Sequence, residues 1–425
     1  MQNDPRSHGL WEATAPAASA TEILTDQIRA DVVIIGGGYT GLSTALHLAE
    51  RGADAVVLEA VQIGFGGAGR NVGLVNAGMW VMPDELVRSL GPEQGNRLLD
   101  FLGEGPAQVW DIIARHGIAC EANHAGTLHV AHDASGLAEL TERHRQWAAR
   151  GAPVELLDRE ATAARLGSAQ YHGALLDRRA GTIQPLAYAR GLARAAIGQG
   201  ARIFTGSPAT ALAPADGGWR VSTPQGAVTA RQVVFATDAY TRHLMPELST
   251  QQVFLPYFNM ATAPVPDEVA HTILPGREGV WDTREVLSSF RFDHQNRLIF
   301  GSVGALRNTG AAIHRAWARR ALARIFPQIG PVEFESEWFG TIGMTSDNLP
   351  RFHQLAEGVV AFCGYNGRGI APGTVFGRAL AGWLTGGNED LPLPSTAPRP
   401  AALRALRGAF YEFGAQAFHL VDARR

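Results

Sequence analysis

Apolar residues change their spacing along the chain, and the first changes predict a βαβ unit. Residues 31–35 (DVVII) are almost entirely apolar, as in a parallel strand buried on both faces. GGGYTG follows at once, and apolar residues then recur at helical spacing until Gly52, which is placed to end a helix. A second apolar run, 55–58, ends at Glu59. Strand, glycine turn, helix, strand and acid in this order predict a site for an adenine dinucleotide.

The remainder of the chain carries the same two kinds of pattern. Helical spacing predicts helices at 83–102, 105–115, 137–150, 185–198, 314–326, 374–385 and 401–425. Short apolar or alternating runs predict strands at 126–131, 202–204, 218–223, 232–236, 288–293, 297–301, 332–339 and 359–363. We expect residues 1–24 to form a polar leader over the surface, and residues 386–400 to form a linker.

The nucleotide-type pattern occurs three times, with strand-rich insertions between the occurrences. This order predicts an α/β, two-domain α+β protein with both domains discontinuous in sequence. We expect a Rossmann-like cofactor domain of 25–83, 185–245 and 341–390. We expect an antiparallel, strand-rich substrate domain of 84–184 and 246–340, followed by a linker and helix in 391–425. A chain of 425 residues is long enough for two cores.

Composition narrows the class of protein. The net charge of −3 and the isoelectric point near 6.5 argue against a nucleic-acid or anionic-membrane partner. No apolar run approaches the ~20 residues of a membrane span, and the first residues do not resemble a secretory signal. Cys120 and Cys363 are too few for a disulfide framework or a metal site. We therefore expect a cytoplasmic protein without a metal.

The chain contains no lysine, so all 37 basic residues are arginine. Codon bias is the simpler explanation of this composition. Its chemical consequence is that neither a Schiff base nor a lysine general base is available.

Two further glycine-rich segments indicate a ligand larger than a nicotinamide dinucleotide. Residues 64–73 (GFGGAGRNVG) follow Glu59 closely and contain Arg70 and Asn71. Residues 364–370 (GYNGRGI) follow an apolar strand and precede a helix, so their amides can face a ring system or a phosphate. Flexible surface turns are the alternative for both, but their position after buried strands favours a ligand.

These motifs, together with ATDAYT at 236–241, resemble the D-amino-acid-oxidase-like superfamily of FAD oxidoreductases over residues 25–390. The 70–71 loop, VLSSFR at 286–291, and WFG…TSDNLP ending at Pro350 resemble its gamma-glutamylputrescine oxidase branch. GRNVGLVNAG at 69–78 and LLDRRAGTI at 175–183 are most similar to bacterial L-pipecolate oxidases. The resemblance implies a D-amino-acid-oxidase or glycine-oxidase-like fold.

The resemblance also implies positions for FAD. The pyrophosphate is expected at Gly36, Gly38, Thr40 and Gly41. The adenosine half is expected at Glu59, Ala60, Ala209, Ala236 and Thr237. The isoalloxazine is expected beside Gly67, Arg70 and Asn71. The flavin is expected to be covered by Gly364, Tyr365, Asn366, Gly367, Arg368, Gly369 and Ile370. A cation such as Arg368 near the flavin N1–C2=O edge stabilises reduced flavin.

Two departures from the family pattern affect the expected chemistry. The Arg70 loop contains no histidine or cysteine for covalent attachment, and Cys363 precedes the last glycine turn inside a strand. We therefore expect non-covalent FAD. Sarcosine-oxidase-like relatives use a lysine to help oxygen react, so here an arginine or histidine substitutes, or the acceptor is not oxygen.

The family reaction transfers a hydride from a carbon next to an amine to flavin N5. Arginine suits carboxylate recognition, and Arg70 and Arg291 are the candidates. For Arg291 the alternative is a strand-edge arginine paired with Asp293 or another acid. Tyr257 and Trp281 are candidates for shaping an apolar pocket, although both can equally be core residues. We expect His47 and His353 at the surface.

Three functions remain open from the sequence. The first is oxidation of a cyclic secondary amino acid, with L-pipecolate as the best candidate. The second is oxidation of gamma-glutamylputrescine, another acyclic amine or a D-amino acid. These two differ in pocket charge, because an amino acid needs a buried arginine near the flavin and a long amine needs an acid. The third is a flavin-binding protein without catalysis.

Overall fold

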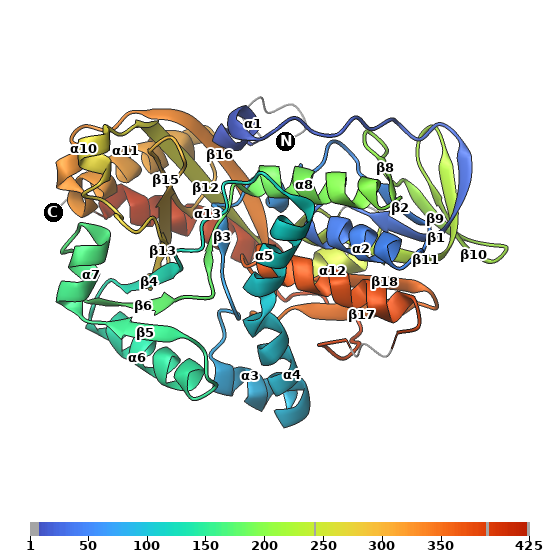
Figure 1. Ribbon diagram of the computed structural model, residues 1–425, viewed down its shortest axis with the longest axis horizontal. Helices are drawn as coiled ribbons and strands as arrows, with labels where there is room; N and C mark the ends of the chain where they lie inside the picture. The colour runs from blue at the N-terminus through green and yellow to red at the C-terminus, as the bar shows by residue number, and fades with distance from the viewer. Residues whose placement is uncertain (1–7, 242–243, 388–390, 423–425) are drawn as a thin grey trace.

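A computed structural model describes residues 8–241, 244–387 and 391–422. One layer is a sheet with a parallel centre (Figure 1). Its strands follow in the order β17 (Arg351–Ala356), β18 (Val359–Cys363), β11 (Ala227–Phe235), β1 (Gln27–Ile35), β2 (Ala55–Leu58) and β8 (Arg202–Phe204). β17 pairs antiparallel with β18, and the hairpin of β9 (Ala211–Ala215) and β10 (Gly218–Ser222) extends β11.

Three helices pack together beside this sheet. They are α2 (Tyr39–Glu50), α8 (Pro185–Gly198) and α12 (Ile370–Leu384), and α2 contacts both others (Figure 1). The strand ends of β1, β2, β11 and β18 point the same way because these strands are parallel. Loops that follow the carboxyl ends therefore meet along one edge, where ligands of such sheets bind.

The second sheet has eight strands and is mostly antiparallel. Its order is β16 (Phe334–Met344), β12 (Val253–Pro264), β15 (Arg297–Val303), β14 (Ser288–Phe292), β13 (Gly279–Asp282), β4 (Thr127–Ala131), β6 (Gly173–Asp177) and β5 (Val154–Leu157). Only β13 and β4 pair in parallel among these neighbours. Helix α6 (Ala134–Ala148) packs on β4, β5 and β6, and α11 (Asn308–Ile325) and α13 (Arg404–Val421) pack together, with α13 also on β12.

Shorter elements complete the fold. The remaining helices are α1 (Leu10–Thr14), α3 (Pro83–Leu90), α4 (Pro92–Gly103), α5 (Gly105–His116), α7 (Arg159–Leu166), α9 (Pro246–Thr250) and α10 (Asp267–Ala270). Single 3₁₀ turns are η1 (Gly67–Gly69), η2 (Asp238–Tyr240) and η3 (Pro327–Ile329). β3 (Leu74–Val75) and β7 (Gly181–Thr182) form a small separate pair.

The predicted fold class is confirmed, because the chain contains one parallel-centred sheet and one mostly antiparallel sheet, each packed with helices. One predicted helix, 83–102, is divided into α3 and α4 at Gly91. Gly91 has a φ of +81°, and the proline that follows it begins a new helix. The domain division stays a prediction; its boundary at residue 340 falls within β16, whose pairing with β12 continues to Met344.

Two predictions of surface position, for His47 and His353, were wrong, and the prediction for the leader 1–24 agrees with residues 12–23 only, which are exposed or partly exposed; residues 1–7 lie outside the described residues. Leu10 and Trp11 of the expected surface leader are buried, and Trp11 packs edge-on against Trp338. His47 is buried because α12 packs against its helix, α2. His353 is fully buried between the Gln251 amide and the carbonyl of residue 396, and its ring hydrogen-bonds to both. A helix or strand face can be assigned from sequence spacing, but the segment that covers it comes from elsewhere in the chain.

Candidate active site

A cavity of about 890 Å³ lies along the edge formed by the carboxyl ends of β1, β2 and β11 and continues to the second sheet. All three glycine-rich segments line it. Its volume is within the range of cofactor and ligand sites. The two ends of the cavity differ. The glycine turns line one end, and side chains of the antiparallel sheet line the other.

The first glycine turn joins β1 to α2. Gly36 has a φ of +112°, and a Cβ there would lie 2.8 Å from the Ala236 carbonyl oxygen. A Cβ on Gly41 would collide with the Gly36 carbonyl, so these two glycines are required by the packing of the chain itself. Gly38 is different, because a Cβ there would meet no protein atom closer than 3.8 Å. It faces the cavity at the N-terminus of α2, where N–H groups favour a phosphate.

Glu59 closes the adenosine end of the cavity. Its carboxylate accepts hydrogen bonds from the N–H groups of Gly37 at 2.8 Å and Val61 at 2.9 Å. Burial raises the pKa of Glu59 above its usual value. A carboxylate has about four acceptor positions, so two backbone donors leave capacity for a ribose hydroxyl. The neighbouring cavity wall is made of Ala60, Pro208, Ala209, Thr210, Ala236 and Thr237.

The loop after β2 is held in shape by Asn71. Its amide nitrogen donates to the carbonyls of Gly67 and Ala68, both at 3.0 Å, and its oxygen accepts from the Gly73 N–H at 2.9 Å. Arg70 donates to the Phe65 carbonyl, and its guanidinium lies 4.4 Å from the centre of the Phe65 ring. The loop is therefore a folded turn with its amides toward the cavity.

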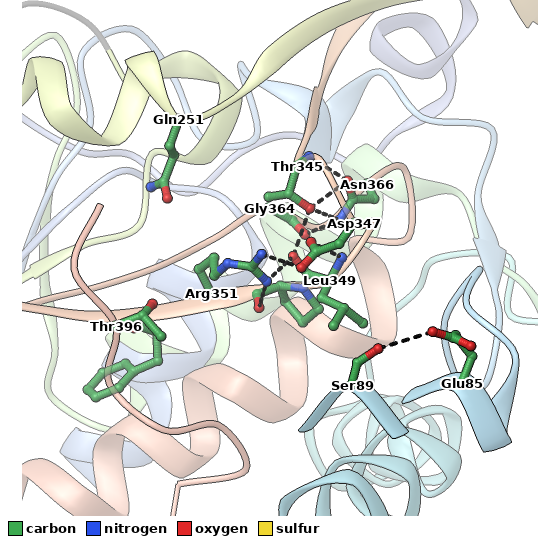
Figure 2. Close-up of polar contacts among 12 residues, drawn as sticks. Glu85, Ser89, Gln251, Thr345, Asp347, Leu349, Arg351, Gly364, Asn366 and Thr396 are labelled. Carbon is green, nitrogen blue, oxygen red and sulfur yellow. Dashed lines mark hydrogen bonds and ion pairs between the residues drawn. The ribbon is translucent and has the colours of Figure 1, made fainter. Parts of the chain in front are cut away.

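The last glycine turn is fixed by Asn366, which has a φ of +52°. Its side chain accepts from the Thr345 N–H at 2.8 Å and donates to the Gly364 carbonyl at 2.6 Å (Figure 2). The Gly364 N–H donates to Asp238 at 2.7 Å, and burial raises the pKa of Asp238 to about 6. These contacts tie the turn after β18 to the end of β16 and to the segment after β11.

The Asp347–Arg351 ion pair, at 2.6 Å, lies next to this network (Figure 2). Both residues flank the Leu349 carbonyl, which accepts from the Thr345 hydroxyl at 2.8 Å and from Arg351 at 3.1 Å. Tyr365 joins the first and last glycine turns, since its hydroxyl lies 2.5 Å from that of Thr40. The walls of the cofactor end are thus connected by hydrogen bonds across segments 300 residues apart.

The residues present fit FAD. A Cβ on Gly38 or Gly67 would have no protein neighbour within 3.7 Å, and one on Gly369 would have none within 4 Å. Packing of the chain does not require glycine at these three positions, whereas close approach of a bound group does. A pyrophosphate at the α2 N-terminus and a flavin between the 64–73 and 364–370 turns would account for all three.

At the other end of the cavity, the Trp80 and Trp281 rings form an aromatic box around the Arg368 guanidinium. The Trp80 and Trp281 rings meet edge to face at 4.8 Å, and the Arg368 guanidinium lies 4.7 Å from each ring. His129 stacks on Trp281 at 3.3 Å. Burial, then Arg143 and Arg368, lower the pKa of His129 well below its usual value, so the ring is neutral at pH 7. The box offers flat apolar walls and one positive charge.

Arg368 has no carboxylate partner among the described residues of the chain. One guanidinium nitrogen donates to the Ala77 carbonyl at 3.0 Å, and Nε has no hydrogen-bond partner among the described residues. The side chain is only 8% exposed, and burial followed by Arg143 lowers the pKa of Arg368 to about 9. A buried cation without an anion is costly, so this position favours an anionic ligand.

The acids near this box have their own partners. Asp282 accepts from the N–H groups of Arg284 at 3.2 Å and Ser288 at 3.1 Å, and from the Ser288 hydroxyl at 3.0 Å. Burial raises the pKa of Asp282 to about 6. Tyr257 and Ser289 share a hydrogen bond of 2.8 Å, and burial raises the pKa of Tyr257 above its usual value. The free charge of the inner cavity is therefore positive.

Comparison with known proteins identifies the class. A family described as "FAD dependent oxidoreductase" matches residues 31–383. The chain belongs to this family. Gamma-glutamylputrescine oxidoreductase of Escherichia coli (strain K12) is 34% identical over 423 residues, which is 97% of each chain. The probable oxidoreductase OrdL of Rhizobium meliloti (strain 1021) is 33% identical over 399 residues, 93% of this chain and 92% of the relative.

Solved structures share the fold of this FAD dependent oxidoreductase. Glycine oxidase from Geobacillus kaustophilus superposes with a TM-score of 0.69 at 21% identity, covering 86% of this chain and 97% of the other. L-amino acid deaminase from Proteus vulgaris gives 0.72 at 19% identity, covering 90% and 95%. The predicted superfamily and branch are thus confirmed. The protein is an FAD-dependent oxidoreductase.

Most of the site residues expected from the sequence line the cavity of the FAD dependent oxidoreductase. These are Gly36, Gly38, Thr40, Glu59, Ala60, Gly67, Arg70, Asn71, Ala209, Ala236, Thr237, Tyr257, Trp281, Tyr365, Asn366, Gly367, Arg368, Gly369 and Ile370. Gly41 and Gly364 lie just outside the lining, where they shape the turns.

Arg291 lies outside the cavity of the FAD dependent oxidoreductase. Its guanidinium donates to three carbonyls, those of Val72 at 2.8 Å, Ile183 at 2.7 Å and Phe292 at 3.0 Å. The alternative pairing with Asp293 is not formed either, because Asp293 pairs with Arg297 at 3.1 Å. Arg291 therefore supports the loop behind Arg70, and it is not in a position to bind a substrate in the cavity.

Several cavity residues of the FAD dependent oxidoreductase were missed by sequence reasoning. Trp80, His129, Arg143, Asp238 and Asp282 come from five separate segments and match no local motif. Tyr240 was quoted only as part of a motif, although its ring lines the cavity and its hydroxyl accepts from the Thr341 N–H at 3.1 Å. Of these residues, Asp238 and Tyr240 carried a local signal, since both lie inside ATDAYT at 236–241.

No helix among the described ranges is long and apolar enough to cross a membrane.

Proposed function

We propose that the enzyme oxidises the carbon–nitrogen bond of an amino acid whose carboxylate binds Arg368, with L-pipecolate as the first candidate. The observation that carries this proposal is the buried guanidinium between Trp80 and Trp281, which has no ion-pair partner in the described chain. A planar fork of donors suits a carboxylate, and two indole walls suit a saturated ring.

Charge favours an amino acid over a long amine near the aromatic box. A protonated amine would need an acid, but buried Asp282 already accepts three hydrogen bonds, from the Arg284 and Ser288 N–H groups and the Ser288 hydroxyl, which leaves one of about four acceptor positions. Arg368 adds a positive charge without a carboxylate partner in the described chain, whereas the charge of Arg143 is offset by Glu139 at 3.1 Å. The charge of Arg368 favours a carboxylate and disfavours a protonated amine, so it lowers the pKa of the bound amine and favours the neutral amine.

The chain's own residues can orient the substrate without supplying a strong base. FAD, when bound, accepts the hydride from the carbon next to nitrogen. Arg368 would hold the carboxylate, while Trp80 and Trp281 exclude water from the reacting carbon. Tyr257 remains a protonated phenol at neutral pH and can donate a hydrogen bond. His129 is neutral there, so it does not repel a cationic imine product.

Gamma-glutamylputrescine is the second candidate. The relative of that name aligns over 97% of the chain, and two exposed acids line the cavity: Glu285, and Glu139, which pairs with Arg143 at 3.1 Å. These acids can hold an ammonium group at the mouth. A substrate with a carboxylate at one end and an amine at the other can therefore use both parts of the cavity.

Anaerobic reduction of the bound flavin tests the proposal. The yellow protein is mixed with L-pipecolate, L-proline, sarcosine, D-alanine or gamma-glutamylputrescine, and the loss of the flavin band is followed. Rapid bleaching by L-pipecolate alone supports the first candidate. Bleaching by gamma-glutamylputrescine alone supports the second, and no bleaching by any of the five refutes this substrate class.

A further inference from the structure

The helix α13 has its apolar side toward solvent and its polar side toward the protein. Between residues 402 and 421, every residue with an exposed side chain is Ala, Leu, Phe or Val. The inward side carries Glu412, which pairs with Arg307, and His419, whose ring nitrogen lies 2.7 Å from that of His314. A surface helix of a monomer normally has the opposite arrangement. This helix therefore has a face that lacks its partner.

Large apolar side chains gather on that face. In the ranges that the structure describes, eight large hydrophobic residues are exposed, and six of them lie here. We call these six the outer stripe: Leu403, Leu406, Phe410, Phe413, Leu420 and Val421. The positions 403, 406, 410, 413, 417 and 420 follow the alternating steps of three and four that two packed helices require. Ala417 fills the one small position in this series.

The outer stripe is held rigidly. Arg307 makes two hydrogen bonds to Glu412, and the Trp317 indole donates to Asp422 at 2.9 Å. Arg320 donates to the His419 carbonyl at 2.8 Å. Figure 1 shows α13 running beside α11, against the same sheet. A helix fixed by these contacts on its inward side presents the stripe without an ordering cost, which favours association.

The area of the stripe matches one half of a dimer interface. Its six residues are 44–71% exposed, which leaves roughly 700 Å² open if a large side chain offers about 150–250 Å². The largest apolar patch of a typical monomer is about 300–600 Å². Each partner in a standard interface contributes about 800 Å². Two Phe side chains at the centre of the stripe are also the residue type that anchors interfaces.

The charges on α13 do not suit a membrane surface. A helix that lies on anionic lipid has basic residues along the border of its apolar face. Within α13, Arg404 lies over the Phe254 ring at 4.8 Å, which leaves the partly buried Arg407 as the other arginine of the helix; Arg307, at the N-terminus of α11, is neutralised by Glu412. The exposed face between residues 402 and 421 contains no charged residue. A partner with an equally uncharged apolar helix fits better.

We propose that two copies of this chain associate through the outer stripes of their α13 helices, packed side by side around a two-fold axis near Phe410 and Phe413. A two-fold contact brings the same patch of both subunits together, and one apolar stripe is complementary to itself. This assembly is independent of which amine the enzyme oxidises.

Sedimentation velocity and light scattering on the FAD-loaded protein test the proposal. We expect the wild type to have about twice the 45.4 kDa mass of one chain at micromolar concentration. The double variant Phe410→Glu/Phe413→Glu should have the mass of one chain, because four carboxylates would meet in the contact. Ile197→Glu, at an exposed apolar position on α8, is the matched control and should remain a dimer.

A crosslinking variant covers the case in which the double variant does not fold. Phe413→Cys should form an intermolecular disulfide on mild oxidation, while Ile197→Cys should not; Cys120 and Cys363 are buried and do not compete. A monomeric wild type, or a dimer that survives the double substitution with its flavin band intact, would overturn the proposal. Sedimentation of a monomeric wild type with lipid vesicles would assign the stripe to a membrane and overturn it equally.

Discussion

Replacing Arg368 by methionine removes the one buried cation that the proposed carboxylate contacts. Methionine keeps much of the side-chain volume between Trp80 and Trp281 but provides no donor. Breaking a buried charge pair by removing one partner costs about 3–5 kcal/mol. Because 1.36 kcal/mol is about tenfold in rate, kcat/KM for L-pipecolate should fall by at least about 10²-fold.

The assay compares two substrates that differ only in the carboxylate. Piperidine has the ring and the amine of L-pipecolate, so its kcat/KM should change little in Arg368→Met. Arg368 also donates to the Ala77 carbonyl, and loss of that bond affects both substrates equally. The ratio of the two kcat/KM values therefore isolates the carboxylate contact. Arg378→Met is the matched control, because Arg378 lies on α12, the helix that follows Arg368, outside the cavity, and donates to Gln108 at 3.0 Å.

The flavin absorbance of each variant separates substrate binding from cofactor binding. If Arg368→Met retains FAD and still prefers L-pipecolate over piperidine by the wild-type factor, the guanidinium does not bind the carboxylate and the reasoning fails. If the variant loses FAD while the control keeps it, Arg368 serves the flavin and not the substrate.

Three further predictions follow from the cofactor end. Gly38→Ala should lose FAD, measured by flavin absorbance, without lowering the melting temperature of the apoprotein, because its Cβ has space in the chain but not beside a pyrophosphate. Gly198→Ala is the control: Gly198 lies in α8, its Cβ would have no neighbour within 4 Å, and the variant should keep FAD. The pKa of Asp238 is raised to about 6, so its contribution to stability is present below the unfolded pKa of 3.8 and is lost as pH rises through 6. Asp238→Asn keeps an acceptor for the Gly364 N–H, so at pH 7.5 its free energy of unfolding, measured with denaturant, should exceed that of the wild type by about 1–3 kcal/mol. At pH 4 the two proteins should have the same free energy of unfolding. An equal difference at both pH values would contradict the assignment. Because the chain has no lysine, the reduced enzyme should be reoxidised more slowly by air than by a soluble quinone in stopped-flow absorbance, and faster reaction with oxygen would show that another cation substitutes.

The cofactor half of the site could be predicted because its signals are local. A glycine turn between a buried strand and a helix needs residues adjacent in sequence, since φ angles and close approach are properties of short segments. Gly36, Gly38 and Glu59 therefore lie where the motif placed them. Strands such as β18 were also found, because residues buried on both faces are apolar without interruption.

Arg291 shows where such reasoning stops. Its spacing from Ser289 places both side chains on one face of β14, and Ser289 does line the cavity. The loop at Val72 and Gly73 covers Arg291, and its carbonyls bind the guanidinium. Sequence period assigns the face of a strand but not the segment that packs over it.

The sequence alone determined the dinucleotide class of the cofactor and the positions of the glycine turns, because both follow from backbone geometry within a few residues, and the order of strands and helices indicated the two-domain α+β fold. Only the tertiary structure decided the substrate end, where Trp80, His129, Trp281 and Arg368 meet. It also decided that α13 buries its polar side and exposes its apolar side. Both depend on which segments pack together, and the free energy of that packing is set by contacts between residues hundreds of positions apart.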